Sequence, residues 1–194
     1  MKKIALSLSV TLLLLSCGKN IQTKKKITSS GVIVGSLDWE ELKPQLENTP
    51  FSNNTRAVGI MVINEKEQCT GFLVSKDIVM TNQHCIPDAR SAKGTTITFG
   101  HDYQAPESDY ITYQCDEFIM ANEKLDFALV RCAPEHGEFP GERFGTVSLE
   151  KSEEKFKGEI YVIQQNCQYF ENRNCDPSKK IAYGKILSEK HLAI

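Results

Sequence analysis

Short apolar stretches rich in Val, Ile and Phe recur along the chain from Gly31 onward and are separated by turn residues. Stretches of this length and composition predict β-strands, and their close spacing favours an all-β sandwich or barrel. We expect strands at 32–34, 57–63, 71–74, 78–81, 95–99, 110–113, 127–130, 159–163 and 179–186. Two further segments, 39–46 and 150–156, are interpreted as short helices or charged loops.

The N-terminal segment follows a different pattern. Two lysines at positions 2 and 3 precede the apolar segment 4–15, which is too short for a membrane-spanning helix and is typical of an export signal. Cys17 follows directly after Leu-Leu-Ser, and this arrangement resembles the lipobox of bacterial lipoproteins. The resemblance implies cleavage before Cys17, a diacylglycerol on its sulfur, and an exported protein anchored to a bacterial membrane in the periplasm or at the cell surface. A plain secretory signal with an incidental cysteine is the alternative.

Composition shifts along the chain predict its domain organisation. The polar segment 17–30 separates the signal, 1–16, from the strand-rich region and predicts a tether. A segment dense in Pro and Gly, 134–141, predicts a linker. It would divide a first β-unit, 31–133, from a second, 142–194.

Composition and cysteine content narrow the class of protein. With 40% hydrophobic and 25% charged residues the chain is globular, and its net charge of −2 argues against a nucleic-acid partner. If Cys17 carries lipid, six of the seven cysteines remain, an even number that indicates disulfides in an exported protein. Six cysteines allow fifteen pairings. Because no Cys-x-x-Cys motif is present, we expect no structural zinc, and we expect no cofactor. The pairing that we favour is the sequential one, Cys69–Cys85, Cys115–Cys132 and Cys167–Cys175.

The strongest local motif lies in the first unit. Gly-Phe-Leu-Val at 71–74 is followed by Thr-Asn-Gln-His-Cys at 81–85. These segments resemble the His motif of trypsin-like and glutamyl-endopeptidase-like serine peptidases, whose common form is Thr-Ala-Ala-His-Cys after a Gly-(Phe/Ser)-Leu-Ile strand. The resemblance implies a double β-barrel and makes His84 the catalytic general base. A disulfide from Cys69 to Cys85 would fix the His loop and contribute roughly 3 kcal/mol of stability.

A second motif supplies the acid that such a histidine needs. Asp126 begins the segment Asp-Phe-Ala-Leu-Val, 42 residues after His84. The same peptidases carry Asp-(Phe/Tyr/Ile)-Ala-Leu-(Leu/Val) at the acid of their Ser-His-Asp triad. The resemblance therefore implies that Asp126 accepts a hydrogen bond from the imidazole and orients it.

The nucleophile of that triad is not found in the sequence. The family places it in Gly-(Asp/Asn/Ser)-Ser-Gly roughly 90 residues after the Asp, at about position 216, and no serine between Cys17 and Ile194 has this context. We therefore expect a complete first barrel, a truncated second barrel, and a serine endopeptidase of proteins or peptides whose Ser-bearing segment is absent, so that the chain as given is inactive. Two alternatives stay open: an inactive homologue that serves as a lipid-anchored binding module, and a structural lipoprotein in which the motifs coincide by chance.

Overall fold

The computed structural model describes residues 39–43, 52–149, 159–165 and 178–185. The predicted signal, the tether, the strand at 32–34, the segment 150–156, Cys17, Cys167 and Cys175 lie outside these residues. The described strands are β1 (Trp39–Glu41), β2 (Val58–Ile63), β3 (Glu67–Leu73), β4 (Ile78–Thr81), β5 (Thr96–Phe99), β6 (Ile111–Gln114), β7 (Glu117–Asn122), β8 (Phe127–Arg131), β9 (Glu159–Gln164) and β10 (Lys180–Lys185). Short helices are α1 (Ser52–Arg56), α2 (Ala89–Ala92) and α3 (Pro140–Phe144), and a 3₁₀ turn covers Glu107–Asp109. No helix of the described ranges has the length and apolarity needed to cross a lipid bilayer.

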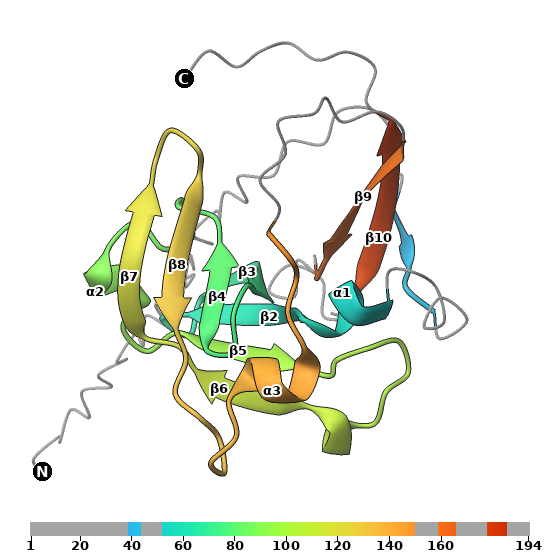
Figure 1. Cartoon of the computed structure of the whole chain (residues 1–194), viewed down its shortest axis with the longest axis horizontal. Coiled ribbons are helices and arrows are strands. Elements are labelled where there is room, and N and C mark those ends of the chain that lie inside the picture. Colours follow the sequence, from blue (N-terminus) through green and yellow to red (C-terminus); the bar gives the residue numbers. More distant parts are fainter. Residues whose placement is uncertain (1–38, 44–51, 150–158, 166–177, 186–194) are drawn as a thin grey trace, which may run out of the picture. The chain divides into compact units, whose positions relative to one another are not determined.

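Seven of the strands form one curled antiparallel sheet in the order β6-β5-β2-β3-β4-β8-β7 (Figure 1). Most neighbouring strands in the sheet are consecutive in the sequence. Two pairings join strands that are not consecutive, β2 with β5 and β4 with β8. The pairing of β4 with β8 matters most for the site, because it places the end of one strand beside the start of another that is far along the chain.

The core of this sheet follows from the alternation of its side chains. In β4, β5 and β8 every second residue is buried, as expected when one face of a strand packs inward. Helix α3 closes the core with Phe144, whose ring stacks on that of Phe99 with a centroid separation of 5.0 Å. The buried cluster includes Met61, Leu73, Val79, Ile97, Phe99, Tyr113 and Val130.

Gly71 shows why the motif at 71–74 begins with glycine. A Cβ atom at this position would lie 2.5 Å from the Sδ atom of Met61 and 2.8 Å from Cγ1 of Val79. Both neighbours belong to the close-packed core, which leaves no space for a larger residue. The absence of a side chain at Gly71 therefore lets β2, β3 and β4 pack closely beneath the His loop.

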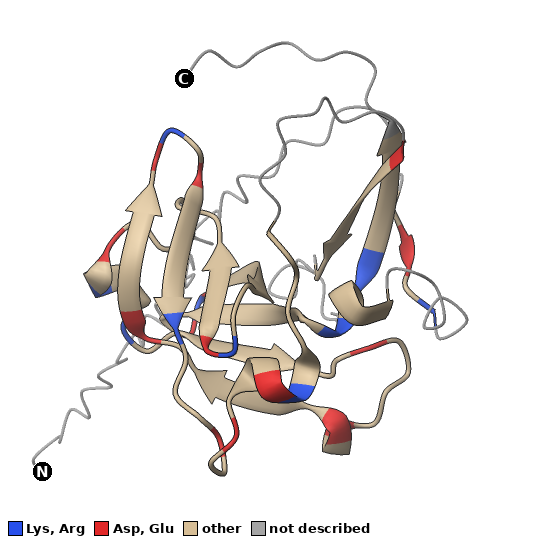
Figure 2. Ribbon diagram, viewed as in Figure 1, with Lys and Arg blue, Asp and Glu red and all other residues tan. Residues whose placement is uncertain are grey.

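A second antiparallel sheet has the described order β1-β10-β9. Polar contacts that join it to the first sheet and its loops include the following two. The backbone N–H of Gln165 donates to Oγ1 of Thr70 at 3.1 Å, and Nζ of the buried Lys179 lies 2.8 Å from Oδ1 of Asp102. Figure 2 shows that the Lys, Arg, Asp and Glu positions of the seven-stranded sheet lie mainly at strand ends and in the connecting loops.

The all-β class predicted from the sequence is confirmed, and eight of the nine expected strands fall on described strands. The interpretation of 39–46 as a helix or loop is wrong for Trp39–Glu41, which pairs with β10 from Lys180 to Ala182. The strand is stabilised by hydrogen bonds to β10, and the sequence of three residues, two of them glutamate, does not predict it. Strand β7 and the three short helices were not expected. In β7 four apolar residues follow one another between Glu117 and Asn122, so that the strand lacks the alternation of polar and apolar residues.

Candidate active site

The loop that carries His84 begins where β4 ends. Thr81, the last residue of β4, is buried and donates from its hydroxyl to the carbonyl of Thr70 at 2.9 Å. The chain then makes one tight turn, in which the carbonyl of Asn82 accepts hydrogen bonds from the backbone N–H groups of Cys85 and Ile86 at 3.2 and 3.3 Å. This turn directs the imidazole of His84 away from the core, and 53% of that side chain is exposed.

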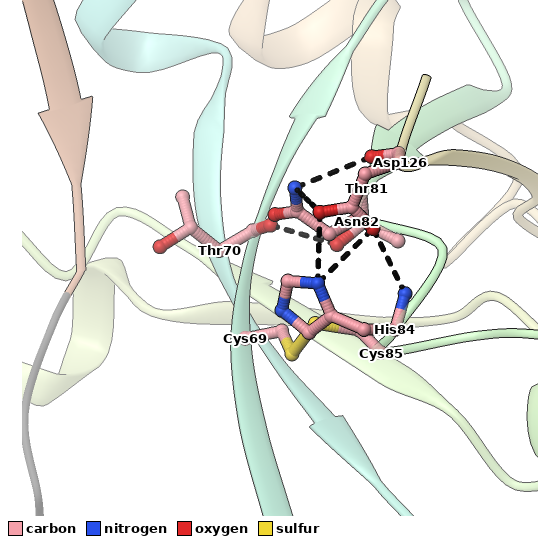
Figure 3. A network of polar contacts seen from close by, with 7 residues as sticks. All are labelled: Cys69, Thr70, Thr81, Asn82, His84, Cys85 and Asp126. Carbon is pink, nitrogen blue, oxygen red and sulfur yellow. Dashed lines mark hydrogen bonds and ion pairs between the residues drawn. A yellow bond between two sulfur atoms is a disulfide. The ribbon is translucent and has the colours of Figure 1, made fainter. Parts of the chain in front are cut away.

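A disulfide fixes the far end of the same turn. Cys85 is bonded to Cys69 of β3 across a sequence separation of 16 residues. Cys85 and the following Ile86 are buried, so that the residue beside the exposed His84 is anchored in the core. This pairing of cysteines was predicted and is confirmed (Figure 3).

The predicted bond between Cys115 and Cys132 is also confirmed. It joins the residue after β6 to the residue after β8, at the end of the β7–β8 hairpin away from its turn, and both cysteines are buried. The third predicted bond, Cys167–Cys175, lies outside the described residues.

Asp126 occupies the end of the turn between β7 and β8. Its N–H donates to the carbonyl of Glu123 at 3.3 Å, and the preceding Leu125 N–H donates to Oδ1 of Asn122 at 2.9 Å. The backbone of Asp126 has φ of +48°, in the left-handed region that non-glycine residues rarely adopt. Asp126 therefore stands in a specialised conformation directly before the regular strand β8.

The structure brings His84 and Asp126 into direct contact. The imidazole Nδ1 atom lies 2.9 Å from Oδ2 and 3.0 Å from Oδ1 of the carboxylate. The backbone N–H of His84 also donates to Oδ1 at 3.1 Å. Because Thr81 pairs with Ala128 in the antiparallel register of β4 and β8, the residues just beyond these two positions face each other.

Sequence reasoning did not anticipate a third member of this network. The side-chain amide of Asn82 donates to Oδ2 of Asp126 at 3.1 Å and to its main-chain carbonyl at 3.3 Å. The only signal in the sequence was that Asn stands where the common form of the motif has Ala. Figure 3 shows the amide and the imidazole approaching the same carboxylate.

These contacts determine the charge state of Asp126. Burial acts to raise the pKa of its carboxyl, but the hydrogen bonds from the backbone and imidazole of His84, the attraction to His84 and the hydrogen bond from Asn82 outweigh it and lower the pKa below 3.8. The carboxylate is therefore ionised at neutral pH and can accept a hydrogen bond from Nδ1–H of the imidazole. This leaves Nε2 as the basic atom of the ring.

Residues 69–191 also show to which protein family the chain belongs. The family model for the trypsin-like peptidase domain matches residues 69–191, a range that includes both His84 and Asp126. The chain belongs to the trypsin-like peptidase family. Peptidases of this family act on proteins or peptides.

Solved structures show the same fold. A Glu endopeptidase solved in complex with MPD superimposes with a TM-score of 0.60 and 16% identity, over 82% of this chain and 73% of that chain. A thermostable serine protease, AL20, from an extremophilic microorganism superimposes with a TM-score of 0.53 and 14% identity, over 71% of this chain and 68% of that chain. The predicted trypsin-like fold is thereby confirmed. No curated protein sequence matches the chain.

Two further properties of this trypsin-like peptidase domain follow from the described residues. The two disulfides indicate an extracytoplasmic protein, because thiols stay reduced in the cytosol. Within the described ranges, no group of three or more His, Cys, Asp or Glu side chains is arranged to hold a metal ion.

Proposed function

We propose that this chain carries the general-base half of a serine endopeptidase site, in which His84 is the base and Asp126 orients it. The observation that carries the proposal is the double contact between the two residues, from the imidazole Nδ1 and from the backbone N–H of His84 to one carboxylate. A chance pairing of a surface His with a surface Asp does not require both contacts.

The chemistry follows from which imidazole nitrogen is free. Asp126 accepts the Nδ1–H hydrogen bond, so that the lone pair of Nε2 can take the proton from a serine hydroxyl as its oxygen attacks a peptide carbonyl. The ionised carboxylate then stabilises the imidazolium, which returns its proton to the departing amine. About half of the His84 side chain is exposed, as expected for a base that must meet both a serine and a substrate.

The nucleophile is proposed to belong to a Gly-x-Ser-Gly segment, which the 194 residues do not contain. The deciding experiment is to sequence the gene beyond codon 194 from an independent template. An in-frame segment of this kind at about position 216 supports the endopeptidase. A stop codon at 195 with no such segment in any frame supports the second candidate, an inactive homologue that acts as a lipid-anchored binding module.

The role of the base requires a test in the complete protein. His84→Ala should abolish hydrolysis of a protein substrate and leave the protein folded with a cooperative thermal transition, because the side chain is half exposed and does not fill the core. The matched control is His136→Ala, whose side chain is 93% exposed and lies outside this network. Retained hydrolysis in His84→Ala would refute the assignment.

Cleavage after glutamate is the substrate preference that we propose. Its support is the resemblance of the His motif to glutamyl endopeptidases, together with the structural likeness to a Glu endopeptidase. A panel of peptides that differ only in the residue before the scissile bond tests it. Faster cleavage after Lys or Phe than after Glu would contradict it.

The lipid anchor at Cys17 is proposed from the Leu-Leu-Ser-Cys segment. In cells fed a labelled fatty acid, the protein should take up label and partition into detergent, and Cys17→Ser should lose both properties. Label retained by Cys17→Ser would exclude this cysteine as the acceptor.

A further inference from the structure

We propose that Asn82 is a positioning residue, whose side-chain amide holds Asp126 in the orientation in which it serves His84. The inference deepens the proposed function and rests on it. It assigns the Asn of the Thr-Asn-Gln-His-Cys segment a role that the alanine of the common motif cannot fill, since alanine has no hydrogen-bond donor in its side chain.

The amide contacts Asp126 at two places. Its Nδ2 atom lies 3.1 Å from Oδ2 of the carboxylate and 3.3 Å from the main-chain carbonyl oxygen of the same residue. Because an amide nitrogen carries two protons, both hydrogen bonds can form together. Asn82 therefore fixes the side chain of Asp126 relative to its own backbone, and both relative to the end of β4.

Asp126 requires such support for two reasons. Its φ of +48° is disfavoured for a residue with a Cβ atom, so that the turn depends on contacts that hold it. Its side chain is 45% exposed, so that water can compete with the hydrogen bonds to the carboxylate. In the described part of the chain, the other hydrogen bonds to the carboxylate come from His84 itself. Without Asn82, the acid would be held only by the residue that it orients.

Asn82 is itself held rigidly enough to act in this way. Its carbonyl accepts the two hydrogen bonds that close the His turn, from Cys85 and Ile86. The disulfide from Cys85 to Cys69 ties that turn to β3. The donor thus stands on a fixed loop next to a strand end, whereas Asp126 stands on a turn with an unusual backbone (Figure 3).

The test uses the oxidised full chain and compares two variants with a neighbouring control. Asn82→Ala removes the donor, and Asn82→Asp keeps the shape but places a second carboxylate beside the first. Gln83→Ala alters the adjacent residue, whose side chain makes no hydrogen bond among the described residues. The readouts are the tautomer of the His84 imidazole, from its ¹⁵N chemical shifts, and the titration of the Asp126 carboxyl, from its ¹³C shift.

We expect both Asn82 variants to shift the neutral imidazole away from the Nδ1–H tautomer and to raise the pKa of Asp126, more strongly for Asn82→Asp. Gln83→Ala should move neither. An Asn82→Ala protein with unchanged ¹⁵N shifts and an unchanged Asp126 titration would overturn the proposal. A merely structural role of Asn82 would lower the melting temperature without changing the tautomer of the folded protein.

These measurements do not depend on hydrolysis, so the two proposals can fail separately. If the tautomer shifts but the complete protein hydrolyses nothing, the positioning role stands and the peptidase function falls. If the complete protein is active, Asn82→Ala should lower kcat/KM by about 10-fold or more, since a misplacement of about 1 Å costs on the order of 10²-fold. Activity within about twofold of wild type would overturn the positioning role alone.

Discussion

The Nδ1 atom of His84 lies 2.9 Å from Oδ2 of Asp126, although 42 residues separate them along the chain. One antiparallel pairing, β4 with β8, brings them together, so that the pair is built entirely within the seven-stranded sheet. The geometry of the base therefore depends on one sheet and two short loops. Three predictions follow from the way these parts are held, and two concern the buried Lys179.

Removing the charge of Asp126 should disable the base without unfolding the protein. In the complete protein, Asp126→Asn should lower kcat by roughly 10⁴-fold, because an amide stabilises neither the required tautomer nor the imidazolium. Near-wild-type circular dichroism would show that the fold is intact. Glu123→Gln, on the same turn, serves as the control for an exposed carboxylate. More than a tenth of wild-type kcat in Asp126→Asn would contradict the role.

The pKa of Asp126 gives the acid dependence of stability a definite sign. The pKa is lowered below its unfolded value of 3.8, so the unfolded chain binds more protons as the pH falls through this region. The stabilising contribution is fully present above pH 3.8 and is lost as the pH falls through the lowered folded value.

Denaturant unfolding at a series of acidic pH values tests this. The difference in free energy of unfolding between wild type and Asp126→Asn should be constant above about pH 5 and shrink toward acid. A difference that grows toward acid would show that the folded pKa of Asp126 is raised. Glu123→Gln again supplies the control.

The two disulfides allow the effect of a lost bond on stability to be separated from its effect on the geometry of the His turn. They close loops of similar size, with sequence separations of 16 and 17 residues. Replacing either pair by alanine should therefore cost a similar free energy of unfolding, about 3 kcal/mol in the chain-entropy model. Only the loss of Cys69–Cys85 should alter the ¹⁵N shifts of His84, because that bond holds the His turn. Equal perturbation of His84 by both replacements would contradict the local role of this bond.

The buried Lys179 should make the protein more stable at alkaline pH. Burial lowers the pKa of its ammonium below 10.5, and the neighbouring Asp102 carboxylate only partly opposes this. Between the lowered folded value and 10.5 the unfolded chain binds more protons, so stability rises with pH across that window. Lys179→Met should abolish the rise, whereas the exposed Lys93→Met should keep it.

The two partners of this ion pair should respond differently to replacement. Lys179→Met exchanges a buried cation for an apolar side chain of similar length and should be neutral or stabilising by about 1–4 kcal/mol. Asp102→Asn leaves the cation buried without its counter-charge and should destabilise the protein, by less than the roughly 3–5 kcal/mol of a fully buried pair, because Asp102 is 40% exposed. Urea unfolding at neutral pH measures both, and an equal loss in the two variants would contradict this account.

Local patterns predicted those parts of the fold that depend on neighbouring residues. Alternating apolar residues predicted the half-buried strands β4, β5 and β8. The motifs around His84 and Asp126 predicted two residues that lie in contact. Contacts between distant polar residues that no motif marks could not be predicted in this way. β1 is three residues long and forms only because β10 lies beside it.

Lys179 and Asn82 illustrate the same limit. A lysine in a polar segment is ordinarily solvated, and nothing near Lys179 in the sequence indicates that Asp102 meets it. Asn82 was visible only as a departure from a motif, because its two acceptors lie on a residue 44 positions away.

The bond between Cys69 and Cys85 also determines how the protein must be prepared for any of these measurements. Material made in a reducing cytoplasm would carry free thiols at both positions, and its His turn would lack the covalent tie to β3. If such material shows no activity, the cause can be the missing disulfide and not an inability of His84 and Asp126 to act in catalysis. Thiol counting should therefore precede every comparison of variants.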